Sequence, residues 1–328
     1  MSEKKEELVT EEKKETINYT EKERKEKFSY TKLDTYSKCP FQFKKKYEEK
    51  KRSSVSSLAM DIGSILHKGK EIIANSLIAE ETPDYEYVRK VVLEGYDEEN
   101  DQKDKHIKGI NELAKQYFED WIARDDKSGM TYDEKLDLYF EHIKSMEEDT
   151  KWQPIAAELK FEFPYRDYLL YGYIDKVEKN KNGDLRVTDY KSSRKTYREQ
   201  DLKTPLQMFV YALAVKEIYK KLPSEFMYDF ILLNEQQLAC SKGYDTRGLK
   251  KLNGLFDAIE ESRKTGIYPP KPSPLCYWCD YCNNNPKADK LYKDECPYYS
   301  LWTPNNKTYK VNKSFNPDEK VEKKKFVF

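Results

Sequence analysis

The most informative part of this chain is residues 158–191, which read ELKFEFPYRDYLLYGYIDKVEKNKNGDLRVTDYK in one-letter code. Leu159, Phe161 and Phe163 alternate with charged residues, and this is the pattern of a β-strand with one buried face. Asn182-Gly183 is a strong signal for a hairpin turn. The segment therefore predicts a block of β-strands.

Two acidic residues and a lysine in this block indicate metal chemistry. Asp175 follows Gly172-Tyr173-Ile174, and thirteen residues separate it from Asp189-Tyr190-Lys191. Side chains at i and i+2 of a strand share a face, so Asp189 and Lys191 point the same way. Carboxylates bind hard divalent cations, and a fixed ammonium can orient a water or stabilise a charged transition state. The combination predicts metal-assisted hydrolysis of phosphodiesters.

An alternative is that these acids are ordinary surface charges, because charged residues make up 37% of the chain. Asp175 and Asp189 differ from such charges because they lie within apolar strand sequence, where a carboxylate without a partner is costly. A bound cation removes that cost, and so does an internal salt bridge with Lys191.

Composition sets broad limits on the class of protein. The 328 residues contain 60 Lys plus Arg and 60 Asp plus Glu, so the formal net charge is zero. A zero average does not exclude nucleic-acid binding, because local patches matter more. The chain has no apolar run as long as a membrane span and no signal-peptide pattern. We therefore expect a soluble, cytoplasmic protein with no membrane partner.

Helical patterns surround the strand block and complete the expected fold. One helix is predicted to begin after Ser29, which suits a helix N-cap. Further helices are predicted over residues 61–79, three segments of 84–149, 201–221 and 246–265, and strands are predicted within 225–240. This order predicts a mixed α/β (α+β) fold in which helices flank a small central mixed sheet.

The domain boundaries follow from changes in composition. We expect one domain over residues 28–302, with a helical insertion at about 84–149 and a cysteine-cluster region at 266–300. A disordered charged tail is expected at residues 1–27 and a flexible basic tail at 303–328.

Cysteines late in the chain predict a second metal or cluster site. Four of the six lie close together, at Cys276, Cys279, Cys282 and Cys296. Disulfides are not expected in a reducing compartment, whereas dense Cys-x2-Cys spacing suits zinc or an iron–sulfur cluster, which spacing alone does not separate. Cys39, located 237 residues before Cys276, is a further candidate ligand.

Three further polar residues are candidates for the first site. His67, in Gly63-Ser64-Ile65-Leu66-His67, is one of only three histidines, and an imidazole ligand would suit Mn²⁺ better than Mg²⁺. Gln207 and Tyr211 are four residues apart on one helix face and could contact a substrate backbone. The alternative for His67 is a partly exposed helical histidine, and for Gln207 and Tyr211 it is ordinary helix amphipathicity.

Together, these segments resemble a known family of nucleases. The chain is similar to RecB-type nucleases of the PD-(D/E)XK superfamily, and more closely to single-chain exonucleases with a four-cysteine iron–sulfur cluster from phages, AddB-type helicase–nucleases and CRISPR adaptation. The resemblance covers about residues 28–296, and its pieces occur in the order of the family. They are Ser29 to Leu33 with Tyr36 to Pro40, Gly63 to His67, Glu158, Gly172 to Asp175, Asp189 to Lys191, and Gln207 to Tyr211.

The resemblance implies a restriction-endonuclease-like core and a role for each residue. His67, Asp175, Asp189 and the Tyr190 carbonyl would hold one Mg²⁺ or Mn²⁺, with Glu158 nearby for a second ion or a water. The catalytic set would be Glu158, Asp175, Asp189 and Lys191, with Lys191 orienting the attacking water. Gln207 and Tyr211 would hold the DNA strand.

The resemblance also implies a cluster, expected to be [4Fe–4S], held by Cys39, Cys276, Cys279 and Cys296. Cys282 is extra relative to the family pattern and is an alternative ligand, and the interval from Cys279 to Cys296 is longer than usual. A zinc site built only from the late cysteines is therefore the alternative to this cluster.

Two basic segments are candidates for DNA contact, because cations follow phosphates and aromatic rings stack on bases. The first contains Lys32, Lys38, Lys44, Lys45 and Lys46 among Tyr36, Phe41, Phe43 and Tyr47. The second contains Arg194, Lys195, Tyr197 and Arg198, just after the lysine of the strand block.

These observations predict a metal-dependent deoxyribonuclease, an exonuclease acting at single-stranded DNA ends in recombination, replication or repair, in the cytoplasm of a phage or bacterial host. Two alternatives remain: a non-catalytic DNA-binding or assembly subunit with the same fold, and a zinc-ribbon interaction protein. The C-terminal Lys323 to Phe328 could dock on a replication or recombination protein.

Overall fold

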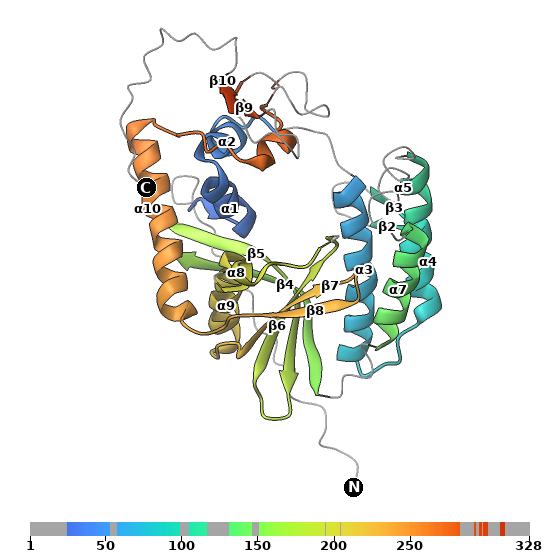
Figure 1. Ribbon diagram of the computed structural model, residues 1–328. Coiled ribbons are helices and arrows are strands. Elements are labelled where there is room, and N and C mark those ends of the chain that lie inside the picture. Colours follow the sequence, from blue (N-terminus) through green and yellow to red (C-terminus); the bar gives the residue numbers. More distant parts are fainter. Residues whose placement is uncertain are drawn as a thin grey trace.

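The computed structural model describes residues 25–52, 58–98, 105–116, 131–145, 151–193, 195–203, 205–282, 292, 295–296, 298–300 and 309–311. Within these residues a mixed sheet has helices packed on both faces (Figure 1). The predicted mixed α/β fold is therefore confirmed.

Six strands of the described chain form the central sheet. They are β1 (Lys27–Phe28), β4 (Trp152–Tyr165), β5 (Tyr168–Asn180), β6 (Leu185–Lys191), β7 (Glu225–Phe230) and β8 (Glu235–Ala239). Three strands pair with β5: β1 in parallel, and β4 and β6 antiparallel. β6 then pairs in parallel with β7, which pairs antiparallel with β8.

The turn between β5 and β6 is the predicted hairpin. Gly183 has φ +79°, a conformation that glycine adopts at little cost. The side-chain oxygen of Asn180 accepts hydrogen bonds from the backbone N–H groups of Asn182 at 2.9 Å and Asp184 at 2.8 Å. The turn holds a register in which Val177 pairs with Val187. Continued along both strands, this register places Asp175 and Asp189 on neighbouring strands at one end of the pair.

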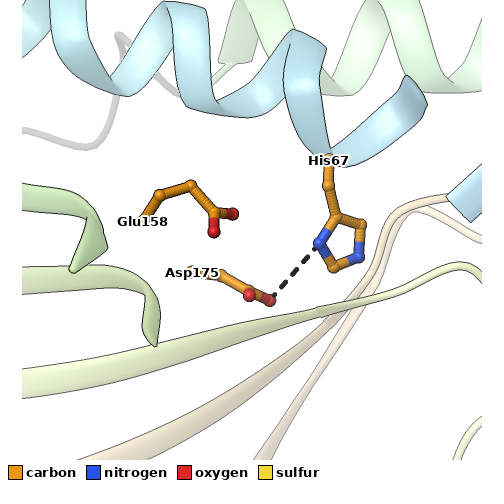
Figure 2. A group of neighbouring side chains, drawn as sticks. All are labelled: His67, Glu158 and Asp175. Carbon is orange, nitrogen blue, oxygen red and sulfur yellow. Dashed lines mark ion pairs between the residues drawn. The ribbon is translucent and has the colours of Figure 1, made fainter. Parts of the chain in front are cut away.

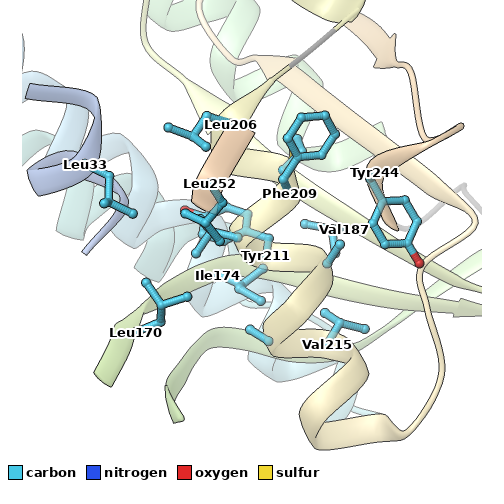
Figure 3. Packing of buried hydrophobic residues seen from close by; sticks show 14 of the residues in the cluster. Leu33, Leu170, Ile174, Val187, Leu206, Phe209, Tyr211, Val215, Tyr244 and Leu252 are labelled. Atoms are coloured by element: carbon cyan, nitrogen blue, oxygen red, sulfur yellow. The ribbon is translucent and has the colours of Figure 1, made fainter. Parts of the chain in front are cut away.

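One face of the sheet packs against four helices: α1 (Tyr30–Lys38), α2 (Pro40–Phe43), α9 (Leu206–Tyr219) and α10 (Leu249–Thr265). Figure 3 shows residues of this core, among them Ile174 and Val187 of the sheet and Leu252 of α10. Ser29 caps α1 as predicted, because its hydroxyl accepts a hydrogen bond from the backbone N–H of Lys32 at 3.2 Å.

The other face supports a second group of helices: α3 (Leu58–Ile78), α4 (Tyr85–Glu94), α5 (Ile110–Gln116) and α7 (Tyr132–Ser145). The last three lie where helical segments were predicted. A short hairpin of β2 (Gly95–Glu98) and β3 (Lys105–Lys108) stands between α4 and α5 and was not predicted.

The remaining elements are short. They are η1 (Lys44–Glu48), α8 (Glu199–Lys203), η3 (Tyr244–Gly248), η4 (Pro274–Trp278), β9 (Tyr298–Ser300) and β10 (Tyr309–Val311). Among the described helices, none is long and apolar enough to cross a membrane.

Both segments predicted to be tails contain strand residues of the described chain. The charge pattern assigns residues 25–27 to the tail, but Lys27 pairs with Leu169 in the sheet, and the Glu26 carboxylate accepts two hydrogen bonds from Arg263 at 2.8 and 2.9 Å. A local pattern does not show such partners, because they lie far away in sequence. β10 lies within the predicted C-terminal tail and pairs antiparallel with β9. Residues 1–24 lie outside the described chain.

Candidate active site

Three side chains from three elements converge beside the sheet (Figure 2). They are His67 of α3, Glu158 of β4 and Asp175 of β5, and each offers a ligand atom within 4.8 Å of the other two. His67 Nδ1 lies 3.7 Å from Asp175 Oδ2. Two carboxylates and an imidazole at this spacing form a candidate site for a divalent cation.

Close packing of α3 against the sheet brings His67 to the carboxylates. At Gly63, one turn before His67, an added Cβ would lie 2.9 Å from the side-chain oxygen of Ser192, which follows β6. A larger residue would have to displace the Ser192 hydroxyl beside the site. The Gly-x3-His spacing therefore has a packing reason.

Glu158 has an unusual backbone conformation. Its φ of +44° lies in the left-handed region, which is uncommon for residues other than glycine. It stands between Ala157, paired with Lys176, and Leu159, paired with Ile174. Such strain is concentrated at functional sites, so the conformation supports a functional role for this carboxylate.

Burial shifts the pKa values of all three side chains. Burial and the neighbouring Asp189 raise the pKa of Asp175 well above its ordinary value. Burial and the nearby Glu71 raise the pKa of Glu158 to about 7. Burial lowers the pKa of His67 to about 4, which leaves its imidazole neutral near pH 7. The group thus offers the uncharged imidazole of His67 and two carboxylates, Glu158 and Asp175, that repel each other when ionised. A bound cation would relieve that repulsion.

Asp189 lies next to this group and is held by three side chains. Its Oδ1 accepts hydrogen bonds from Gln207 Nε2 at 2.7 Å and from the Tyr211 hydroxyl at 3.4 Å. The Lys191 ammonium lies 2.5 Å from Oδ2 and forms an ion pair with it. Asp189 is therefore fixed beside the metal-ligand group by one charged side chain and two neutral ones.

Lys191 is positively charged near pH 7. Burial opposes its charge, but the Asp189 carboxylate outweighs burial and raises the pKa of Lys191 above its ordinary value. Its ammonium also donates a hydrogen bond to Gln207 Oε1 at 3.0 Å. Two groups therefore orient the ammonium at the edge of the site.

Tyr190 connects the two parts of the site through its backbone. Its N–H donates a hydrogen bond to Asp175 Oδ2 at 2.6 Å, and a further backbone hydrogen bond joins it to His67. Its ring meets the imidazole edge-on at 5.6 Å between centroids. The structure therefore brings all the residues predicted for the metal and catalytic sets into one neighbourhood, with Glu158 rather than Asp189 in the tightest group.

Gln207 and Tyr211 were predicted to contact DNA. Only 6% of Tyr211 is exposed, and its hydroxyl is directed at Asp189. Gln207 also donates a hydrogen bond to that hydroxyl at 3.0 Å. Both side chains therefore orient Asp189, and Gln207 also orients Lys191.

An open groove gives access to the carboxylates. Its volume is about 610 Å³, and it runs beside α3. The lining residues are Ala59, Met60, Gly63, Ser64, His67, Lys68, Glu71, Tyr96, Glu158 and Ser192.

The sequence analysis missed a buried ion cluster behind the site. Lys70, one turn after His67 on α3, is completely buried and contacts the Asp229 carboxylate on β7. His142 Nε2 of α7 lies 3.0 Å from Asp229 Oδ1. A signal was present, because Lys70 interrupts the apolar stripe of α3 at a core-facing position, between Leu66 and Ile73.

The cysteines predicted to hold a cluster come together. Cys39, Cys276, Cys279, Cys282 and Cys296 all line one pocket. No disulfide joins the six cysteines, all of which are described. The backbone N–H of Lys271 points to Cys39 Sγ at 3.5 Å, and that of Ser273 to Cys276 Sγ at 3.4 Å. Burial raises the pKa of the Cys276 and Cys279 thiols.

Most of the basic residues predicted to contact DNA have protein partners. Lys45 pairs with Glu49 at 3.0 Å and Glu295 at 2.9 Å, and Arg198 pairs with Asp201 at 2.9 Å. The other partners are Glu26 for Lys32, Asp34 for Lys38, the Tyr268 ring for Lys44 and the Tyr47 ring for Lys46. Lys195 is exposed, and Arg194 lies outside the described residues.

Comparison with known proteins agrees with this geometry. No curated protein matches the chain. A family model described as the PD-(D/E)XK nuclease superfamily matches residues 27–284, which include the sheet, α3 and three of the late cysteines. Members of this superfamily are metal-dependent nucleases built on a mixed sheet flanked by helices, as found in this structure. The chain belongs to the PD-(D/E)XK nuclease superfamily.

Proposed function

We propose that the protein is a Mg²⁺- or Mn²⁺-dependent DNA exonuclease of the RecB-like type, acting at single-stranded ends in recombination, replication or repair. One observation supports this best: His67, Glu158 and Asp175 converge within 4.8 Å, beside the Asp189–Lys191 ion pair. The superfamily membership supports nuclease activity, and the exonuclease mode is our proposal.

The residues present suit a divalent cation. His67, Glu158 and Asp175 would hold it, and the Asp189 carboxylate, paired with Lys191 at 2.5 Å, lies beside them. Oxygen-rich ligand sets favour Mg²⁺ or Mn²⁺, and the single imidazole favours Mn²⁺. When bound, such a cation supplies Lewis-acid polarisation of the scissile phosphate.

The protein's own residues then perform two tasks. Lys191, oriented by Asp189 and Gln207, presents a fixed positive charge that can orient a water or meet charge developing on the phosphate. Glu158, whose pKa is about 7 without a cation, would give up its proton and bind as a carboxylate when the cation enters the site. Both groups act in a partly buried site, where electrostatic interactions are stronger than in water.

We also propose that the cysteine pocket holds an iron–sulfur cluster, ligated by Cys39, Cys276, Cys279 and Cys296, with Cys282 as the alternative ligand. In a tetrahedral zinc site the sulfurs lie roughly 3.8 Å apart, given Zn–S bonds of about 2.3 Å. No three cysteine sulfurs of the described chain lie within 4.8 Å of one another. This wider spacing favours a larger cluster over a single zinc ion.

The cluster would act as a structural clip. Cys39 precedes α2, and Cys276 lies in η4, so a shared cluster closes a loop of more than two hundred residues. Such closure lowers the entropy of the unfolded chain and adds ligation energy to folding.

Cleavage assays test the nuclease. End-labelled single-stranded and duplex DNA are incubated with MgCl₂ or MnCl₂; release of short products from the ends supports an exonuclease, and internal fragments contradict it. We expect Asp175→Asn and Lys191→Ala to lower the rate by at least about 10²-fold, the size of effect seen when a stabilising charge is lost. Asp184→Asn, on the turn after β5, is the matched control and should keep full rate.

A different result would favour the runner-up function. A wild-type protein that binds DNA but cleaves none with either cation is a non-catalytic DNA-binding subunit. This test does not depend on the second basic segment or on the C-terminal residues Lys323 to Phe328. Those C-terminal residues, predicted to dock on a replication or recombination protein, lie outside the described residues.

Anaerobic purification with iron, sulfide and zinc analysis tests the cluster. We expect a brown protein, loss of iron and a lower melting temperature in Cys39→Ser, and no change in Cys240→Ser, whose cysteine lies outside the pocket. Zinc without iron, or full iron in Cys39→Ser, would remove the cluster proposal while leaving the nuclease proposal intact.

A further inference from the structure

Two exposed tyrosines stand on β5 just before the candidate metal group. Tyr171 is 37% exposed and Tyr173 is 51% exposed. Residues between and beside them face the core: Ile174 is fully buried, and a Cβ on Gly172 would lie 2.9 Å from the Phe161 ring. Alternate residues of a strand share a face, so Tyr171 and Tyr173 lie on the same face as Asp175.

The neighbouring strand adds a positive charge to this face. In the β4–β5 register Tyr173 pairs with Lys160, and Tyr171 pairs with Glu162, and both partners are exposed. Glu162 Oε2 lies 2.5 Å from Lys27 Nζ, which neutralises its charge. The face is therefore aromatic and cationic, a composition that suits a nucleic-acid strand.

A second basic and aromatic group lies at η1. Lys46 Nζ lies 5.7 Å and the Arg52 guanidinium 5.4 Å from the Tyr47 ring centre. Phosphates and bases of a bound strand would find the same kinds of partner here as on β5.

We propose that Tyr171 and Tyr173 form a stacking platform for the bases of a single-stranded DNA end whose scissile phosphate lies at the His67–Glu158–Asp175 group. This inference rests on the proposed nuclease function and names residues that would bind the bases of its single-stranded substrate. Unpaired bases offer their faces to aromatic side chains, whereas bases in a duplex are already stacked on each other. Lys160 follows the backbone of the bound strand as a phosphate contact.

Binding measurements without cleavage test this platform. The dissociation constant for a labelled oligothymidylate of about 20 nucleotides, longer than one binding site, is measured in EDTA for wild type, Tyr171→Leu and Tyr173→Leu. Stacking contributes about 1–3 kcal/mol per base, so each variant should bind about 5- to 150-fold more weakly. Tyr173→Phe keeps the ring and should bind as wild type does. Tyr87→Leu, a 53% exposed tyrosine on α4, is the matched control.

Further arms of the experiment separate base stacking from phosphate contacts and from unfolding. Lys160→Gln should flatten the salt dependence of binding, whereas the leucine variants should keep the wild-type slope. A blunt duplex of the same length should bind equally to wild type and the leucine variants. Unchanged melting temperatures exclude unfolding as the cause of any loss.

The results distinguish this inference from the proposed function. If the leucine variants bind oligothymidylate as tightly as wild type does, the platform is refuted, even where wild type cleaves DNA with Mn²⁺. If binding depends on both tyrosines but no cation supports cleavage, the platform stands and the nuclease proposal fails. Tyrosine dependence seen only with an RNA oligonucleotide would overturn the assignment to DNA.

Discussion

Four acidic residues of the same sheet occupy two contrasting environments. Asp229 and Glu178 are buried and have cationic partners: Lys70 contacts Asp229, and Arg186 Nε donates to Glu178 Oε2 at 2.8 Å. Asp175 and Glu158 are also withdrawn from water, but neither forms an ion pair with a lysine or arginine of the described chain.

The difference appears in their pKa values. Burial alone would raise the pKa of Glu178, but Lys176 and Arg186 lower it to about 2. Burial likewise opposes the charge of Asp229, but Lys70 and His142 hold its pKa below the ordinary value.

Asp175 and Glu158 shift in the opposite direction, because no comparable cation offsets their burial. The Asp229 carboxylate ties two helices, α3 and α7, to the sheet, and the Glu178 carboxylate ties β5 to β6. Asp175 and Glu158 have no such partner among the described residues and can bind a cationic ligand. Similar residues on adjacent strands thus contribute to stability in one environment and to function in the other.

Removing the lysine that pairs with Asp229 should have the largest effect on stability. Lys70→Met leaves Asp229 buried without its main partner, so the free energy of unfolding should fall by about 3–5 kcal/mol. Urea denaturation measures the change. Lys68→Met, on the same helix, removes a partly exposed pair with Glu71 and should cost less than about 1 kcal/mol. Equal losses in the two variants would break the comparison.

The second largest effect should come from acid, which weakens the ion pairs of Glu178. The folded-state pKa of Glu178 is lowered from 4.5 to about 2, so its stabilising contribution is complete above pH 4.5 and is lost as pH falls toward 2. The loss amounts to at most about 3 kcal/mol. Unfolding free energies measured across this range should decline less steeply in Glu178→Gln than in wild type. Parallel curves would contradict the assigned ion pairs.

A divalent metal ion bound at Asp175 and Glu158 should stabilise the folded protein by a smaller amount. Mn²⁺ at about 100 times its dissociation constant should raise the unfolding free energy by about 2.7 kcal/mol. Asp175→Asn should lose this response and, because it removes one of two repelling carboxylates, should be more stable than wild type without metal by about 1 kcal/mol. Thermal melts with and without MnCl₂ measure both effects. An undiminished response in Asp175→Asn would place the cation elsewhere.

Much of the local structure was predictable. The alternation around Leu159 and Phe161 predicted β4, Asn182-Gly183 predicted the turn after β5, and Ser29 predicted the start of α1. Each prediction depends on interactions between residues close in sequence. The chemistry of the site was also visible, because acidic residues inside apolar strands need a partner.

The partners themselves were less predictable. Lys70, Asp229 and His142 form their cluster across 159 and 87 residues, and no local pattern connects them. The resemblance to nucleases grouped Asp189 with His67, whereas packing places Glu158 in the tightest group. The inward position of Tyr211 was missed because its helix is apolar on most sides, so periodicity did not identify the exposed face.

The sequence by itself determined the strands, their turn, the supply of carboxylates, imidazole and ammonium, and the membership of a nuclease superfamily. Only the tertiary structure decided which carboxylates meet a lysine and which meet one another. The physical reason is that ion pairing depends on distance and burial, and these arise from the packing of helices on both faces of the sheet.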